Sequence, residues 1–344
     1  MQTSVPISFE RQARQHIRRL CPLILLASSI AQAPAQSPTP ESPVLTLHVS
    51  TQLVLVDASV EHKNSGEPIE GLTPADFMLT EDGVPQVITS LSEAQLPLSV
   101  VLLFDLTDTV HPVLVHLSGG AAAVLRHLRP QDEVAVMTFS SQGKVVQGFT
   151  HDRMSAVEGI DSASASYDRS EPTFLSEDLW QASQQTAQSR LPDARRVQIW
   201  LSDGSANDQE RDRPLARHAP AVLHTEAEAT DALLHSDAVV SALIERSQMP
   251  LTTGRFGDLE RYAALTGGPV LYATASDAAQ RLSALLDTLR ERYTLGYRPS
   301  TPRAPGTVCS LQLTLSPAFF AAHPGVRARE ITLRSRHSYV RSAP

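Results

Sequence analysis

The sequence predicts an α/β fold, a Rossmann-like domain with a mainly parallel central sheet covered by helices, with short β strands before and after it. Three observations support this prediction. The apolar run Val100–Phe104 lacks polar alternation, which is typical of a strand buried on both faces. Candidate strands and helices alternate over residues 98–291, as in helix-covered parallel sheets. On either side of that stretch, apolar and polar residues alternate between turn residues, which indicates antiparallel strands.

Residues 1–35 have the parts of a secretory signal peptide. A basic segment contains four arginines between Arg11 and Arg19, Leu20–Ile30 is apolar, and Ala31–Ala35 offers small residues for cleavage. The apolar part is shorter than the about 20 residues that a membrane span requires. We therefore expect a secreted or periplasmic protein that has no transmembrane segment after signal removal.

The charge of the chain and its cysteine content bear on which partners it can bind and on whether it has a reactive thiol. The full chain has a formal net charge of -8, from 29 basic and 37 acidic side chains. Removal of residues 1–35 takes away four arginines and Glu10, which leaves 25 basic and 36 acidic side chains and a net charge of -11. No basic patch favours nucleic acid or anionic lipid. Cys309 is then the one remaining cysteine, and its apolar neighbours predict a small buried side chain.

The elements follow in order along the chain. We expect a signal peptide at 1–35, a proline-containing linker at 36–43, an N-terminal β module at 44–97, the α/β domain at 98–291 and C-terminal β strands at 292–344 that pair with the module. Within the α/β domain we expect strands at 98–105, 133–139, 144–149, 196–202, 237–244 and 269–273, and helices near 112–128, 174–190, 221–234, 258–265 and 276–291.

The apolar run ends in a sequence rich in oxygen ligands. Asp105, Thr107 and Thr109 place a carboxylate and two hydroxyls at every second position, just beyond the strand end where ligands collect in α/β sheets. Mg²⁺ prefers such hard oxygens and takes about six, some of them from water. So little negative charge leaves a coordination position open. The same residues are also common in turns and helix N-caps, and this short motif alone leaves both interpretations open.

Two further loops add ligands of the same kind. Asp203 follows the predicted strand Val197–Leu201 and precedes Gly204, which can make a tight turn. Thr173 lies just before the helix predicted at 174–190 and offers a third hydroxyl. Three loops with oxygen ligands favour a metal site more strongly than one.

The motifs together resemble those of von Willebrand factor A (VWA) domain proteins, specifically a VWFA-related subgroup first noted in acidobacterial proteins. The resemblance extends over nearly all of the chain after residue 35. It rests on Gly71–Phe77 with Glu81–Gly83, on Asp132–Phe139, Phe149–Arg153 and Leu201–Gly204, and on Tyr293–Pro299.

The resemblance implies a metal-ion-dependent adhesion site (MIDAS), written D-x-S-x-S with a distant Thr and a distant Asp. It implies that Asp105, Thr107, Thr109, Thr173 and Asp203 are the metal ligands, that Mg²⁺ is the ion, with Mn²⁺ or Ca²⁺ as alternatives, and that a protein partner completes the metal shell with a carboxylate. No catalytic or cofactor-binding residues are implied. Thr stands here where the family pattern has both serines, and Asp108 where it often has glycine.

Two other interpretations remain open. Asp105–Thr109 also resembles the D-K-T-G-T loop of haloacid-dehalogenase-like phosphotransferases, in which the first Asp is the nucleophile and Mg²⁺ neutralises the phosphate. Those enzymes need a lysine for the phosphoryl charge, and this chain has only Lys63 and Lys144. The third interpretation is a structural protein whose degenerate site holds no metal.

Overall fold

A computed structural model describes residues 53–93, 95–107, 110–140, 143–166, 173–203, 222–245 and 257–342. All of them belong to one compact unit, Val49–Pro344. The predicted signal peptide, the linker and the first alternating residues of the N-terminal module lie outside these ranges. Within them, no helix combines the length and the apolar character that crossing a membrane requires.

A six-stranded sheet forms the centre of the α/β domain, as predicted. Its order is β10-β9-β8-β5-β6-β7, and each neighbouring pair is parallel except β6 and β7, which are antiparallel. The strands lie close to their predicted positions. Their bounds are β5 (Leu98–Asp105), β6 (Glu133–Phe139), β7 (Lys144–Thr150), β8 (Arg195–Ser202), β9 (Val239–Glu245) and β10 (Val270–Ala273).

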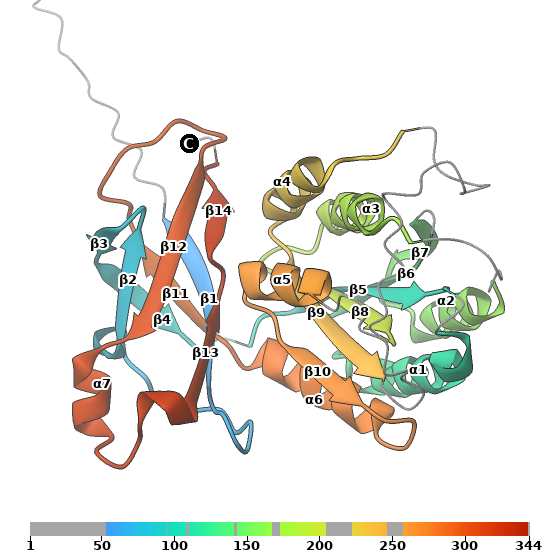
Figure 1. Ribbon diagram of the computed structural model, residues 1–344, viewed down its shortest axis with the longest axis horizontal. Helices are drawn as coiled ribbons and strands as arrows, with labels where there is room; N and C mark the ends of the chain where they lie inside the picture. Colours follow the sequence, from blue (N-terminus) through green and yellow to red (C-terminus); the bar gives the residue numbers. More distant parts are fainter. Residues whose placement is uncertain are drawn as a thin grey trace, which may run out of the picture. The chain divides into compact units, whose positions relative to one another are not determined.

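Helices cover both faces of this sheet (Figure 1). On one face, α1 (His111–Val124), α2 (Arg153–Ala165) and α6 (Ala278–Arg290) pack against Val100, Leu102 and Phe104 of β5. On the other face, α3 (Leu175–Ala187), α4 (Glu226–Ser236) and α5 (Gly257–Thr266) pack on a cluster that contains Val101 and Leu103. Because successive side chains of a strand point to opposite faces, a strand between two helical layers is apolar on both faces, as Val100–Phe104 is.

Helix α2 was not among the predicted elements, and the ends of α4 differ from those expected. The carboxylate of Asp152 caps α2 by accepting a hydrogen bond from the backbone N–H of Met154. Helix α4 begins later than predicted because Thr225 and Glu228 form a capping box. It ends at Ser236, two residues beyond the predicted end, and the following Asp237 caps it in the left-handed conformation with φ 59.

The flanking strands form two antiparallel four-stranded sheets, β13-β1-β11-β4 and β14-β12-β2-β3. Each combines strands from before and after the α/β domain, so the two β flanks pair with each other. The sheets share one apolar core, which includes the buried Cys309. Their bounds are β1 (Val54–His62), β2 (Phe77–Glu81), β3 (Val84–Gln86), β4 (Ile88–Ser92), β11 (Tyr293–Tyr297), β12 (Val308–Leu315), β13 (Ile331–Ser335) and β14 (Ser338–Val340), and α7 (Pro317–Ala322) also contributes to the core.

Buried arginines join the elements away from the proposed metal site. Arg195 at the start of β8 donates to the carboxylate of Asp57 on β1 (2.6 Å) and to the carbonyl oxygen of Leu289 at the end of α6 (2.8 Å). Burial alone would raise the pKa of Asp57, but the Arg195 guanidinium lowers that pKa to about 2. Arg290 of α6 pairs in the same way with the buried Asp132 at 2.7 Å.

The backbone at Gly268, between α5 and β10, leaves no room for a side chain. A Cβ there would lie 1.8 Å from the carbonyl oxygen of Val240 on β9. We expect Gly268→Ala to lower the free energy of unfolding by about 2–3 kcal/mol, measured by urea denaturation, because the backbone must shift to relieve the overlap. Gly325→Ala is the matched control, since no atom lies within 4 Å of the position that its added methyl group would take. Equal stability of the two variants would contradict this account of the packing.

Candidate metal centre

The three loops that the sequence analysis identifies lie at one edge of the central sheet. Asp105 is the last residue of β5, and Asp203 directly follows the neighbouring strand β8. Phe174 donates its backbone N–H to the carbonyl oxygen of Ser140 after β6 (3.0 Å), which holds Thr173 and the start of α3 over the next strand. The site therefore spans the carboxyl ends of β8, β5 and β6.

Asp105 is the central residue of this edge, and it is 2% exposed. Its Oδ1 accepts hydrogen bonds from the backbone N–H (2.9 Å) and the hydroxyl (2.7 Å) of Thr107. Its Oδ2 accepts one from the hydroxyl of Ser202 at 2.6 Å. The contacts with Thr107 are those of an ordinary turn, so the turn interpretation of this motif holds whatever else the residues bind.

Burial and a neighbouring charge make the carboxylate form of Asp105 costly. Burial raises its pKa, the hydrogen bond from Ser202 lowers it, and the carboxylate of Asp203 raises it again, to about 7. Asp203 is itself buried. Each of these buried carboxylates makes ionisation of the other less favourable. A bound cation would stabilise both in their charged form.

The two threonines within the described ranges are also buried at this edge. Thr173 Oγ1 has no hydrogen-bond partner among the residues that the structure describes. A buried hydroxyl left in this state costs about 1–3 kcal/mol, so its oxygen fits the role of a metal ligand. Thr107 is fully buried beside Asp105. Thr109 and Asp108 lie outside the described residues.

Sequence reasoning missed two residues at this edge. Ser202 donates to Asp105, although its place in the Ser-Asp-Gly turn suggested no role of its own. Asp178 of α3 is fully buried, and neither of its oxygens has a hydrogen-bond partner of ordinary geometry within the described part of the chain. Burial, and after it the charge of Asp105, raises the pKa of Asp178 well above its usual value.

Glu177, the acid next to Asp178, has several hydrogen-bond partners. Glu177 accepts hydrogen bonds from the backbone N–H of His224 (3.0 Å) and from the side chain of Gln181 (2.7 Å), and its carboxylate lies 2.7 Å from His224 Nδ1. The His224 ring stacks on Trp180 at 3.8 Å. Glu177 therefore links α3 to the segment before α4.

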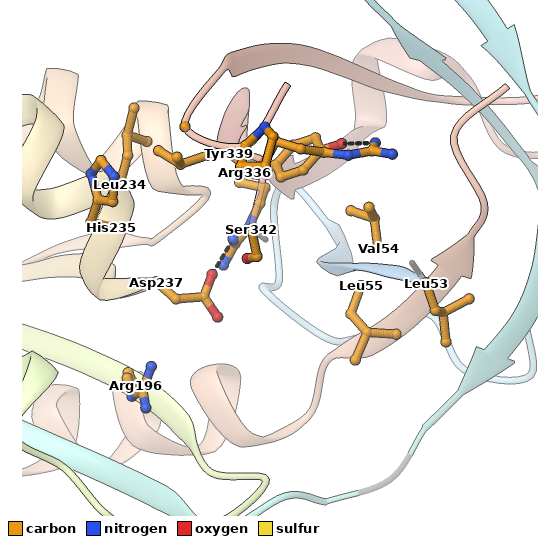
Figure 2. Close-up of a pocket in the computed structure, with 14 residues that line it drawn as sticks. Leu53, Val54, Leu55, Arg196, Leu234, His235, Asp237, Arg336, Tyr339 and Ser342 are labelled. Carbon is orange, nitrogen blue, oxygen red and sulfur yellow. Dashed lines mark hydrogen bonds and ion pairs between the residues drawn. The ribbon is translucent and has the colours of Figure 1, made fainter. Parts of the chain in front are cut away.

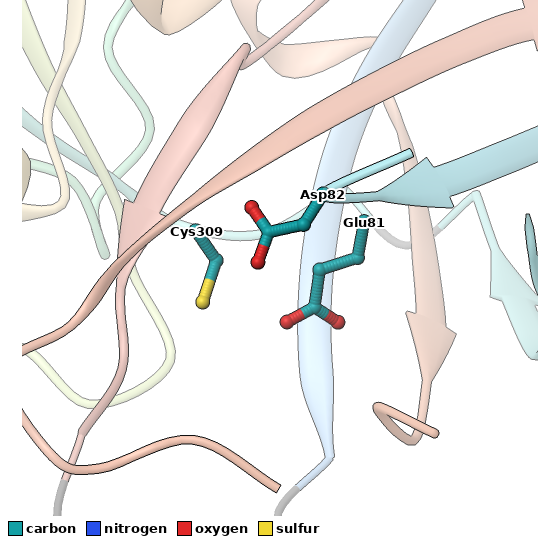
Figure 3. A group of neighbouring side chains, drawn as sticks. All are labelled: Glu81, Asp82 and Cys309. Carbon is teal, nitrogen blue, oxygen red and sulfur yellow. The ribbon is translucent and has the colours of Figure 1, made fainter. Parts of the chain in front are cut away.

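A second acidic group lies in the β module, where Glu81, Asp82 and Cys309 each place one ligand atom within 4.8 Å of the others (Figure 3). Its carboxylates already have protein donors. Glu81 accepts from the hydroxyls of Tyr297 (3.1 Å) and Tyr339 (3.0 Å). Asp82 accepts from the backbone N–H and hydroxyl of Ser310. Hydrogen bonds to these protein donors are sufficient to explain why the acidic side chains of this group lie close together.

A cavity of about 520 Å³ lies at the opposite edge of the central sheet (Figure 2). Its lining includes Arg196 near the start of β8 and Asp237 just before β9, so it adjoins the amino ends of these strands. Asp237 forms an ion pair with Arg336 across it. The cavity is therefore separate from the site at the carboxyl ends.

Comparison with known proteins finds solved structures of similar fold but no matching family model or curated protein. Solved structures with a similar fold include the conserved hypothetical protein BatB from Bacteroides thetaiotaomicron, with 15% identity over 56% of this chain and 98% of that one and a TM-score of 0.42. A von Willebrand factor type A protein from Catenulispora acidiphila matches with 10% identity, over 85% of this chain and 74% of that one, at a TM-score of 0.41. Proximal thread matrix protein 1 from the mussel byssus, in a structure with a zinc-occupied MIDAS motif, matches with 14% identity over 57% of this chain, at a TM-score of 0.41. This chain spans about half of that protein's length (48%).

The raised pKa of Asp105 predicts a pH dependence of stability in the metal-free chain. The folded-state value of about 7 exceeds the unfolded value of about 3.9, so the folded state binds more protons between these limits. The free energy of unfolding should therefore fall as the pH rises from about 4 to about 7. In Asp105→Asn, this fall should be smaller than in the wild type by about 2–4 kcal/mol.

Urea denaturation at pH 4.5 and pH 8 in the presence of a chelator measures both falls. Comparison of each protein with itself at the two pH values removes the constant effect of the lost hydrogen bonds. Equal falls in the two proteins would show that Asp105 has an ordinary pKa.

Proposed function

We propose that this chain is an exported, non-enzymatic binding protein that holds a divalent cation and, through it, a protein partner. Mg²⁺ is the proposed ion, with Mn²⁺ or Ca²⁺ as alternatives, and the proposed ligands are Asp105, Thr107, Thr109, Thr173 and Asp203. The observation that carries this proposal is the buried pair Asp105 and Asp203 at the same sheet edge as the hydroxyl of Thr173, which has no hydrogen-bond partner among the described residues. The proposed export rests on residues 1–35 as a signal peptide.

The charges of the site fit such a role. The carboxylates of Asp105 and Asp203 match the charge of a divalent cation, while the threonine hydroxyls add oxygen donors without charge. When bound, the cation supplies positive charge that an acidic side chain of a partner can approach. The chain's own residues orient that contact, because the hydrogen bonds of Thr107 and Ser202 fix the carboxylate of Asp105 at the end of β5.

The phosphotransferase interpretation is less well supported by the geometry. A nucleophilic Asp105 needs an accessible oxygen, but this residue is buried and both of its oxygens accept hydrogen bonds. Lys144 starts the edge strand β7, where it pairs with Thr138 of β6 and is exposed to solvent. Lys63 follows β1 in the β module.

Isothermal titration of the metal-free chain with Mg²⁺ and with Mn²⁺ tests the proposal. We expect saturable binding that is weakened by at least about 100-fold in Asp105→Ala, because the central carboxylate is lost. Saturating ion should also stabilise the wild type, by about 2.7 kcal/mol at a concentration 100 times the Kd.

Asp161→Ala is the control, since it removes an exposed aspartate from α2. It should bind the ion as the wild type does. A wild-type chain that shows neither heat of binding nor stabilisation with either ion would favour the structural interpretation instead.

A further inference from the structure

Asp178 differs from the buried acids Asp132 and Glu81 because neither of its oxygens has a hydrogen-bond partner of ordinary geometry among the described residues. Asp132 accepts hydrogen bonds from the backbone N–H of Leu98 (2.9 Å) and pairs with Arg290. Glu81 accepts from two tyrosine hydroxyls. Both oxygens of Asp178, in contrast, are buried without a hydrogen-bond partner in the described part of the chain. Buried carboxylates are normally paired or bound to a metal, so this one requires an explanation.

The position of Asp178 places it at the proposed metal site. It lies in the first turn of α3, where its backbone N–H donates to the carbonyl oxygen of Phe174, the residue that is anchored to Ser140 at the end of β6. A Cβ on Gly143, in the loop between β6 and β7, would lie 3.4 Å from Asp178 Oδ1. The carboxylate is also close enough to Asp105 for the two charges to interact. Asp203, Asp105 and Asp178 thus come from elements at the carboxyl ends of β8, β5 and β6.

The spacing of the three carboxylates indicates how they would share an ion. Oxygens that bind one Mg²⁺ directly lie at most about 4.2 Å apart, since each bond is about 2.1 Å long. Among the described residues, these three acids do not place one oxygen each within 4.8 Å of the other two. At least one of them therefore acts through a water molecule. Asp178 comes from a helix rather than from a strand end, so it is the outer member.

We propose that Asp178 is a third carboxylate of the metal site and accepts a hydrogen bond from a water ligand of the bound cation. This inference rests on the proposed function, because it adds a residue to the same site. It accounts for the two oxygens of Asp178 that have no hydrogen-bond partner in the described part of the chain. It also leaves the inner coordination position free for a partner, because Asp178 would contact the ion only through water.

Titration of the full chain with Mn²⁺ and with Mg²⁺ tests this role. Asp178→Asn keeps the shape of the side chain and removes its charge, and we expect a Kd about 10- to 100-fold weaker than in the wild type, as for other residues that orient a metal's ligands. Asp161→Asn makes the same chemical change on the exposed side of α2 and should leave the Kd unchanged. The metal-free unfolding temperature of Asp178→Asn should be at least that of the wild type, because a buried carboxyl group without a hydrogen-bond partner among the described residues is replaced by a neutral amide of the same shape.

The outcomes separate the two proposals. If Asp178→Asn binds within about twofold of the wild type while Asp105→Ala loses binding, this inference is wrong and the proposed function stands. If the wild type binds no ion, both are wrong. Should Asp178→Asn fail to fold, Asp178→Ala serves for the same titration, and wild-type affinity in that variant would overturn the inference equally.

Discussion

Burial of β5 on both faces is the constraint on which the rest of the structure depends. All eight residues of this strand are buried, and helices cover each side of it. Apart from Ser99, whose hydroxyl donates to the buried carboxylate of Glu133, the strand is apolar until it ends at Asp105. Asp105 stands at that point, between the ends of β8 and β6. The same packing that requires an apolar strand thus determines where a polar site can form.

The chain neutralises its buried acids in two ways. Far from the carboxyl ends of the sheet, it uses its own side chains, as Arg195 does for Asp57 and Arg290 for Asp132. At the carboxyl ends, Asp105 accepts hydrogen bonds from neutral groups only, within the described residues. Neutral donors also serve the buried Glu133, which accepts hydrogen bonds from Ser99 and Ser189. Asp105 differs because a second buried carboxylate, Asp203, lies near enough to raise its pKa, and such a pair favours a cation from outside the chain at that edge.

The sequence predicted the features that depend on local pattern. The unbroken apolar run identified β5, and oxygen-bearing residues after two strands and before a helix identified the edge at which Asp105, Asp203 and Thr173 meet. Helix α2 escaped prediction because its buried face consists of Ala156, Gly159, Ile160 and Ala163, which form no marked apolar stripe. Gly159 is small for a reason that only the fold shows, since a Cβ there would lie 2.8 Å from the side chain of Gln147.

The burial of Asp178 at the sheet edge could not be predicted for a similar reason. Glu177 and Asp178 are adjacent acids in one helical turn, and no sequence pattern distinguishes them. The rotation of α3 against β6 turns one toward His224 and buries the other at the sheet edge. Such a rotation depends on the packing of the whole layer.

A crystal structure of the chain soaked with Mn²⁺, with an anomalous difference map, tests the central claim most directly. We expect one strong peak at the carboxyl end of β5, within bonding distance of the Asp105 carboxylate and next to Thr173 and Asp203. A fully occupied peak elsewhere, for example beside Glu81 and Asp82, or the absence of any peak at saturating Mn²⁺, would contradict it.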